Sequence, residues 1–291
     1  QQEHPDHSGG GSSHVTQARA VPLSASIERT RPRIALKVVV TAAIGYFRSN
    51  ARHASSGDMQ QFLIAMLGIA LAGGGASVLN QYLEQDVDAK MERTKNRPIP
   101  AGIVSPSVAL YLGATMAISG CLMPWLYVHP LTAFLTLQSI FLYVLVYTPM
   151  KRLTWWNTSV GAIPGAMPPL MGWAAASSTL DAGAWILFAV MYIWQHPHFW
   201  AIAWMYREDY ERGGLKMLPV VQPDGKNLSR QVIGFCLLLI PVSLIPTVID
   251  MSGPVYFVGA LTLGILFLAY GIKFVRTKNE VTARTLIRRS Q

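Results

Sequence analysis

Three side chains at the end of an apolar stretch have the types and spacing of a metal site. Asn80, Glu84 and Asp88 follow one another at intervals of four residues, directly after FLIAMLGIALAGGGASVL. On a helix this spacing stacks them along one face, and Asp86 lies well off that face. Because stacked acids repel one another, the pattern favours a cation between them, and hard oxygen ligands suit Mg²⁺. The alternative is a solvated loop whose acids pair with its own bases.

Bases follow these acids closely. Arg93, Lys95 and Arg97 lie within one short loop. Mg²⁺ held by carboxylates usually shares its shell with a substrate phosphate, and basic side chains contact the same phosphate oxygens. The glycines at 73–75 thin the preceding helix, so that a large ligand or a second backbone can approach it. These features favour a phosphate-binding site over a solvated loop.

A second segment, YREDYERGGLKMLPVV at 206–221, repeats the mixture of acids and bases after another apolar run. Its charged residues are Arg207, Glu208, Asp209, Glu211, Arg212 and Lys216. Two such clusters on one side of a membrane would frame a single polar pocket above an apolar cavity. That shape suits a ligand with a diphosphate head and a hydrocarbon tail.

Two histidines flank Pro197 in WQHPHFW at 194–200. Ionisable side chains at membrane depth are usually functional, so His196 and His198 are candidates for haem-iron ligation or for a bond to a substrate carboxylate. The alternative is that one of them bonds the backbone carbonyl that Pro197 leaves free. Lys151 and Arg152 end another apolar run and face the same side, either as phosphate contacts or as topology signals, and Asn157 opens the next run.

Long apolar runs must position these groups. We expect membrane spans at 34–50, 59–83, 107–127, 131–149, 157–176, 183–205, 231–250 and 254–274, because each approaches or exceeds the ~20 residues that cross a bilayer. The prolines of GAIPGAMPPLMGW predict a kinked or broken fifth helix. Lys and Arg gather in the N-terminal segment and after the second, fourth, sixth and eighth spans, and the other side holds only Arg48 and Arg52. The positive-inside rule therefore places the N-terminus in the cytoplasm.

The composition agrees with an all-α, polytopic membrane protein. The 291 residues are 51% hydrophobic and 13% charged, with mean hydropathy +0.31, whereas soluble proteins carry about 25% charge. The net charge of +9 lies at the ends of apolar runs, which argues against nucleic-acid binding. Cys121 and Cys236 lie inside apolar runs, so no disulfide framework is expected. Residues 1–28 are expected to form a disordered polar tail, and 29–291 one membrane domain.

At these residues the chain resembles the UbiA superfamily of intramembrane prenyltransferases, from RPRIALKVVVTA to near residue 290. The superfamily's first motif, Asn-x₃-Asp-x₃-Asp, appears as Asn80, Glu84 and Asp88. NRPIPAG, YTPMKRLTWWNTSVGAIPGAMPPLMGW, WQHPHFWAIAW and EDYERGGLKMLPVV resemble the haem-farnesylating branch. The second motif usually has Asp at both ends of Asp-x₃-Asp, but here those places are Tyr206 and Tyr210. The resemblance implies a second metal at this motif, with Glu208 and Asp209, which lie between the tyrosines, as the two candidate ligands.

The resemblance implies a nine-helix bundle around a cavity, of which eight spans are predicted, and TARTLIRRSQ resembles the lead-in to a ninth. The sequence is therefore expected to be cut short before that helix. The implied reaction is Mg²⁺-dependent transfer of farnesyl from farnesyl diphosphate to a vinyl group of haem b, with addition of water. The implied setting is a bacterial cytoplasmic membrane, with contacts to haem a synthase or terminal-oxidase assembly.

The candidate residues fall into three groups. The proposed catalytic residues are Asn80, Glu84, Asp88 and Asp209. The proposed metal ligands are Asn80, Glu84, Asp88, Glu208 and Asp209. The proposed substrate contacts are Arg93, Lys95, Arg97, Lys151, Arg152, Arg212, Lys216, His196, His198 and Asn157.

Three rival functions remain open at this point. A UbiA-type aromatic prenyltransferase of a quinone pathway would accept 4-hydroxybenzoate and not haem. A haem transporter would line a path with its acids and histidines, although the acids cluster at one face only. A non-catalytic assembly factor for a terminal oxidase would need none of this chemistry.

Overall fold

A computed structural model of the chain describes residues 32–53 and 58–290, and every regular element in these ranges is a helix. The predicted all-α class is therefore confirmed. The predicted polar tail, residues 1–28, lies outside the described residues.

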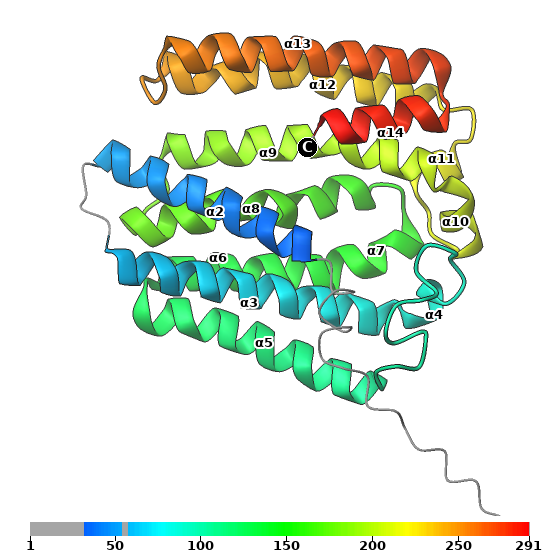
Figure 1. Cartoon of the computed structure of the whole chain (residues 1–291), viewed down its shortest axis with the longest axis horizontal. Helices are drawn as coiled ribbons and strands as arrows, with labels where there is room; N and C mark the ends of the chain where they lie inside the picture. The colour runs from blue at the N-terminus through cyan, green and yellow to red at the C-terminus, as the bar shows by residue number, and fades with distance from the viewer. Residues whose placement is uncertain (1–31, 54–57, 291) are drawn as a thin grey trace, which may run out of the picture.

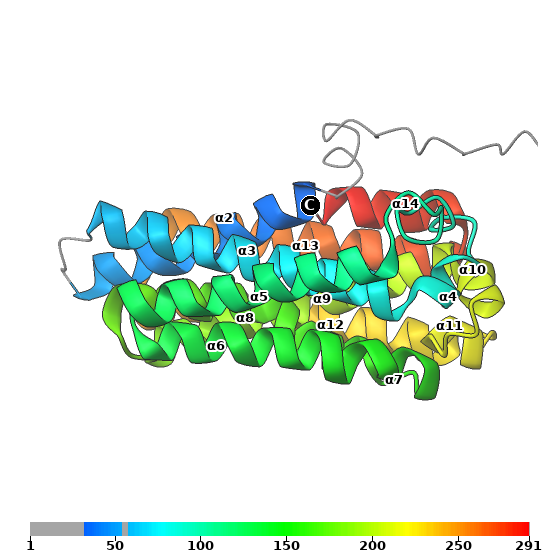
Figure 2. The same cartoon turned by 90° about the horizontal axis from the view of Figure 1, so that it is seen from below.

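Each predicted span coincides with a long helical segment of the described chain. These segments are α2 (Pro32–His53), α3 (Met59–Leu83), α5 (Pro106–Tyr127), α6 (Pro130–Phe141) continuing through η1 (Leu142–Tyr147) and α7 (Thr148–Leu153), α8 (Asn157–Ser177), α9 (Ala182–Met205), α12 (Lys226–Val248) and α13 (Pro254–Thr277). They lie side by side, with α12 and α13 along one edge and α5 along the other (Figure 1; Figure 2).

Short helices gather at one end of this bundle. They are α4 (Gln85–Asp88), α10 (Arg207–Arg212) and α11 (Leu218–Val221), and α7 ends beside them (Figure 1). α14 (Glu280–Arg289) turns back from the end of α13 and packs Ala283 and Leu286 against α9 and α13. TARTLIRRSQ, expected to lead into a further helix, thus forms most of α14.

Five of the long segments are long and apolar enough to cross a membrane: α3, α5, the continuous helix 130–153, α12 and α13. Many large apolar side chains on the outside of the bundle are exposed, as on α13, where Val255 and Leu263 point outward. α2, α8 and α9 are also long, with 22, 21 and 24 residues. They are not among the five helices that are long and apolar enough by length and composition, so the count of eight spans stays a prediction.

Small residues let α3 and α5 approach closely. A Cβ atom placed on Gly75 would lie 2.5 Å from the Ala117 backbone nitrogen and 2.7 Å from the Gly113 carbonyl oxygen. A Cβ atom placed on Gly120 would likewise clash with the Ala72 backbone nitrogen. Of the glycines at 73–75, Gly75 therefore admits a second backbone, that of α5, which is one of the two occupants that the sequence predicts.

The prolines of α8 predict a kinked or broken helix. The helix is continuous, with Pro164, Pro168 and Pro169 inside it, so the break does not occur, and the kink stays a prediction. Pro168 has no N–H to donate to the Pro164 carbonyl one turn earlier. The Ser139 hydroxyl of α6 donates to that carbonyl instead, at 3.4 Å. A neighbouring helix thus satisfies a group that proline leaves free, as membrane helices require.

We predict that Gly75→Ala lowers the thermal midpoint of the purified protein in detergent, because the added methyl pushes α3 away from α5. Overpacking of this kind costs on the order of 1–3 kcal/mol. Gly234→Ala in α12 is the matched control, since nothing lies within 4 Å of its added Cβ. Equal midpoints for the two variants would contradict the close α3–α5 packing.

Candidate active site

The two charged segments meet at one end of the bundle, as their positions in the sequence predict. The Asp209 carboxylate of α10 accepts hydrogen bonds from the backbone N–H groups of Glu92 (3.0 Å) and Arg93 (3.2 Å). Both segments lie at the end where α4, α7, α10 and α11 gather (Figure 1). A single polar region therefore covers this end of the helices.

The helix that carries the first cluster ends earlier than expected. α3 stops at Leu83, and Glu84 has φ −104° and ψ 10°, after which α4 begins. The Glu84 N–H still bonds the Asn80 carbonyl (3.0 Å), and the Asp88 N–H bonds the Glu84 carbonyl (2.7 Å). The four-residue spacing thus survives the break, and Asn80, Glu84 and Asp88 are all buried, whereas the Asp86 side chain is exposed.

Glu84 lies at the centre of a buried hydrogen-bonded network. Asn80 Nδ2 donates to Glu84 Oε2 (3.1 Å) and to Thr148 Oγ1 (2.9 Å). Lys151 Nζ lies 2.7 Å from the Glu84 carboxylate, and both side chains are less than a tenth exposed. A buried carboxylate needs a partner of opposite charge, and Lys151 is that partner here.

Asp88 is fully buried and only partly satisfied. Arg97 Nη1 lies 2.6 Å from Asp88 Oδ2, while Oδ1 has no hydrogen-bond partner. Burial raises the pKa of the Asp88 carboxyl; Arg97 opposes this rise and Glu84 adds to it. A buried oxygen without a partner in a ring of ionic groups is an available ligand for a cation.

These groups fit a hard divalent cation. One amide and two carboxylates provide oxygen donors of the kind that Mg²⁺ binds, with room in its shell for substrate or water oxygens. Within residues 32–53 and 58–290, no three His, Cys, Asp or Glu side chains form a metal site by themselves. The Asn80 amide and oxygens from a ligand would therefore have to complete the shell.

Thr148, Tyr143 and Tyr147 belong to this network and were not predicted from the sequence. Thr148 accepts from Asn80 and donates to the Tyr143 carbonyl (2.9 Å), five residues back, in the region where the helix widens into η1. Lys151 Nζ lies 4.7 Å from the centre of the Tyr147 ring. Tyr143, Tyr147 and Lys151 have the same four-residue spacing as the acids, a signal that was available in the sequence.

Several predicted contacts have other roles in the structure. Arg152 bonds Asp86 through both carboxylate oxygens (2.7 and 3.0 Å) on the exposed surface. Asn157 is fully buried and donates to the carbonyls of Thr154 (2.6 Å) and Lys216 (3.0 Å), so it ties two loops together. The Lys216 side chain is exposed, and its backbone N–H bonds the Lys151 carbonyl (2.7 Å).

The acids of α10 also differ from the prediction that they hold metal. Asp209 uses both oxygens to bind the backbone of the first loop, and Arg212 forms an ion pair with it. Burial raises the pKa of Asp209, but Arg212 and the two N–H donors outweigh it and lower the pKa below its ordinary value. The Glu208 side chain is exposed beside Arg207. Asp209 therefore joins the two segments, and Glu208 faces outward.

The two histidines are part of helix packing. His196 is fully buried, with Nδ1 2.7 Å from the Tyr192 carbonyl and Nε2 3.2 Å from Ser159 Oγ. Pro197 has no N–H to donate to the Ile193 carbonyl one turn earlier. His196 does not bond that free carbonyl, because its partner is the carbonyl of Tyr192. His198 Nδ1 lies 2.6 Å from Ser290 Oγ. Both ring nitrogens of His196 are therefore occupied, whereas the hydrogen bond of His198 engages Nδ1 alone, so the haem contact stays a prediction.

Comparison with known proteins identifies the family. Residues 38–289 match the UbiA prenyltransferase family. The chain belongs to this family. A protoheme IX farnesyltransferase of Solibacter usitatus is 43% identical over 90% of this chain and 91% of its own length. This UbiA chain therefore groups with relatives from the haem-farnesylating branch that its motifs resemble.

Solved structures show the same fold. Digeranylgeranylglyceryl phosphate synthase has a TM-score of 0.75 at 17% identity, covering 92% of both chains. A UbiA homologue from Archaeoglobus fulgidus, bound to DMAPP and Mg²⁺, has a TM-score of 0.64 at 13% identity and covers 91% of this chain and 97% of its own. The expected UbiA-type helical bundle is confirmed.

We predict that Lys151→Met destabilises the metal-free protein by about 3–5 kcal/mol, because it leaves the Glu84 carboxylate buried without a partner. Glu84→Gln in the same chain should recover much of this loss. Arg152→Met is the matched control: its pair with Asp86 is exposed, so its loss should change stability by about 1 kcal/mol or less. Denaturation midpoints in detergent measure all three, and similar losses for Lys151→Met and Arg152→Met would contradict the buried pair.

Proposed function

We propose that the chain transfers a farnesyl group from farnesyl diphosphate to a vinyl group of haem b, giving haem o and diphosphate. The relatives named protoheme IX farnesyltransferase support the substrates. The observation that carries the chemistry is the buried set of Asn80, Glu84 and Asp88, with its unpartnered Asp88 oxygen, at the charged end of an apolar bundle.

A bound Mg²⁺ ion and the basic side chains of the polar end would together bind the diphosphate. Mg²⁺ bound by Asn80, Glu84 and Asp88 would neutralise charge on the leaving group, as metal ions do in phosphoryl chemistry. Lys151, Arg97 and Arg93 lie at the same end and would contact the remaining phosphate oxygens. Since these groups are fixed in place by the network, they stabilise the charge that develops as the allylic C–O bond ionises.

The bond changes follow from this ionisation. The C–O electron pair leaves with diphosphate, and the allylic cation accepts the π electrons of the haem vinyl group, forming the new C–C bond. The cation left next to the porphyrin takes up water, which then loses a proton to become a hydroxyl group. No strong base on the chain is required, so the hydrogen bonds of His196 and His198 within the helix bundle are consistent with this route.

We also propose that the polar end faces the cytoplasm, with the N-terminus on the same side of a bacterial inner membrane. Lys and Arg concentrate at that end, whereas Arg48 and Arg52 lie at the other end, beside Ser252 and Asp181. This distribution is the one that the positive-inside rule associates with the cytoplasmic face. Contacts with haem a synthase or a terminal oxidase stay a prediction.

The experiment is to incubate membranes containing the chain with haem b and farnesyl diphosphate, with and without Mg²⁺, and to look for haem o by mass. We expect haem o only when Mg²⁺ is present. A parallel reaction with 4-hydroxybenzoate tests the quinone-pathway alternative. Prenylated hydroxybenzoate without haem o would overturn the proposal, and no product from either acceptor would favour the transporter or assembly-factor alternatives.

We predict that Asp88→Asn lowers kcat about 100-fold, because it removes a charged group aimed at the metal and leaving group. Asp86→Asn is the matched control, two residues away, with a side chain that is exposed and paired on the surface. It should keep near-normal turnover. Initial rates of haem o formation at saturating Mg²⁺ measure both variants, and near-normal rates for Asp88→Asn would rule out its part in the site.

A further inference from the structure

Arg93 is held between two tyrosines at the polar end. Its guanidinium carbon lies 4.5 Å from the centre of the Tyr206 ring and 5.1 Å from that of Tyr210. Arg93 Nη2 also donates to the Tyr210 hydroxyl (3.1 Å). Tyr206 caps the end of α9 and Tyr210 lies one turn later in α10, so both rings reach the same guanidinium. We call this arrangement the arginine cradle.

The cradle is fixed from the backbone as well. The Arg93 N–H donates to Asp209 Oδ2 (3.2 Å), and the N–H of Glu92 donates to Oδ1 (3.0 Å). Asp209 lies between the two tyrosines in sequence, so one short segment anchors both the backbone and the side chain of Arg93. The buried Arg93 Nε has no hydrogen-bond partner. An arginine so placed keeps a donor available for a ligand.

The cradle and the acidic network are joined by one loop. Arg97 pairs with Asp88 (2.6 Å), and the Thr94 hydroxyl donates to the Asp88 carbonyl (3.0 Å). Arg93 directly precedes Thr94, so the loop that closes on Asp88 also carries the guanidinium of the cradle.

No carboxylate of α10 is placed to hold a cation with the first cluster. Asp209 is engaged with backbone N–H groups and Arg212, Glu208 is exposed, and Glu211 is exposed as well. Tyrosine rings attract a guanidinium by their electron-rich faces, but a neutral phenol is a poor ligand for Mg²⁺, which prefers carboxylates. Tyr206 and Tyr210 stand where the resemblance places acidic residues, and the cation that these two rings hold is the guanidinium of Arg93.

We propose that Arg93, held in the arginine cradle, takes the place of a second metal ion at the diphosphate, so that one divalent cation is bound with each prenyl diphosphate. Tyr206 and Tyr210 are positioning residues: they orient the planar guanidinium, whose fork of donors matches phosphate oxygens. This inference rests on the proposed function, because it concerns how the same leaving group is neutralised.

The first experiment counts metal ions. The purified full chain is equilibrated with Mn²⁺ and a farnesyl thiodiphosphate analogue that does not ionise, and bound Mn²⁺ and bound analogue are both measured after dialysis. We expect one Mn²⁺ for each analogue. Two Mn²⁺ for each analogue would overturn the inference and leave the proposed function intact, whereas absence of any analogue binding would overturn both.

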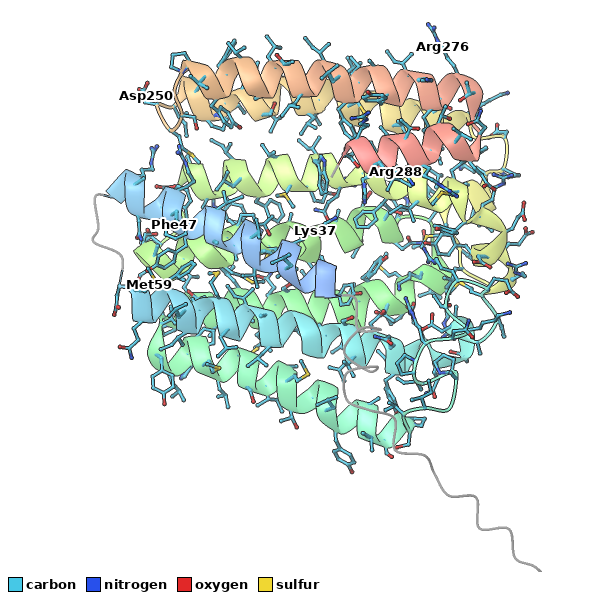
Figure 3. All side chains as sticks on the ribbon, in the orientation of Figure 1. Lys37, Phe47, Met59, Asp250, Arg276 and Arg288 are labelled. Carbon is cyan, nitrogen blue, oxygen red and sulfur yellow. The ribbon has the colours of Figure 1, made fainter. Side chains whose placement is uncertain are left out.

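The second experiment separates the cradle from general stability. Analogue affinity is measured for Arg93→Lys, Tyr206→Phe and Tyr206→Leu. The control is Arg276→Lys, at an exposed position in the last turn of α13 (Figure 3). We expect Tyr206→Phe to bind like the unaltered chain, since it keeps the ring, and Tyr206→Leu to bind about tenfold more weakly. Arg93→Lys should also weaken binding about tenfold, because lysine lacks the planar fork. Equal affinity for Tyr206→Leu and Tyr206→Phe would contradict the role of the ring.

Discussion

The need to pair buried carboxylates with cations governs the polar end of this bundle. Glu84 and Asp88 are both buried where α3 ends, and an ionised carboxylate away from water is costly unless a charged partner faces it. Lys151 comes to Glu84 from the fourth long helix, and Arg97 comes to Asp88 from the loop that follows α4. These two pairs fix the relative positions of α3, α7 and the loop, and the remaining contacts of the site are arranged around them.

The sequence is sufficient to predict the main elements and the first cluster. Long apolar runs locate the helices, because a chain in lipid has few other ways to satisfy its backbone. The four-residue spacing separates Asn80, Glu84 and Asp88 from the exposed Asp86, since side-chain direction on a helix depends on local periodicity alone. These predictions rely on local geometry, and the structure agrees with them even across the break at Glu84.

Roles that depend on tertiary contacts are not visible in the sequence. Asp209 has the charge of a metal ligand, but its partners are backbone N–H groups from a distant loop. Asn157 is polar and next to bases, yet it is fully buried as a tie between loops. His196 is ionisable, but its two nitrogens are occupied by Tyr192 and Ser159. In each case residue type indicates what a side chain is able to bind, and only packing decides what it meets.

The widened turn η1 sets the rotational phase of the helix that follows it. A π-type turn accommodates one residue more than an α-turn, and one residue corresponds to about 100° of rotation. Thr148 and Lys151 lie just after η1 and face Asn80 and Glu84. If the helix ran as regular α through residues 142–147, both side chains would turn away by that angle, and Lys151 would point toward lipid or a neighbouring helix. The extra residue in η1 therefore rotates α7 so that Thr148 and Lys151 face the end of α3.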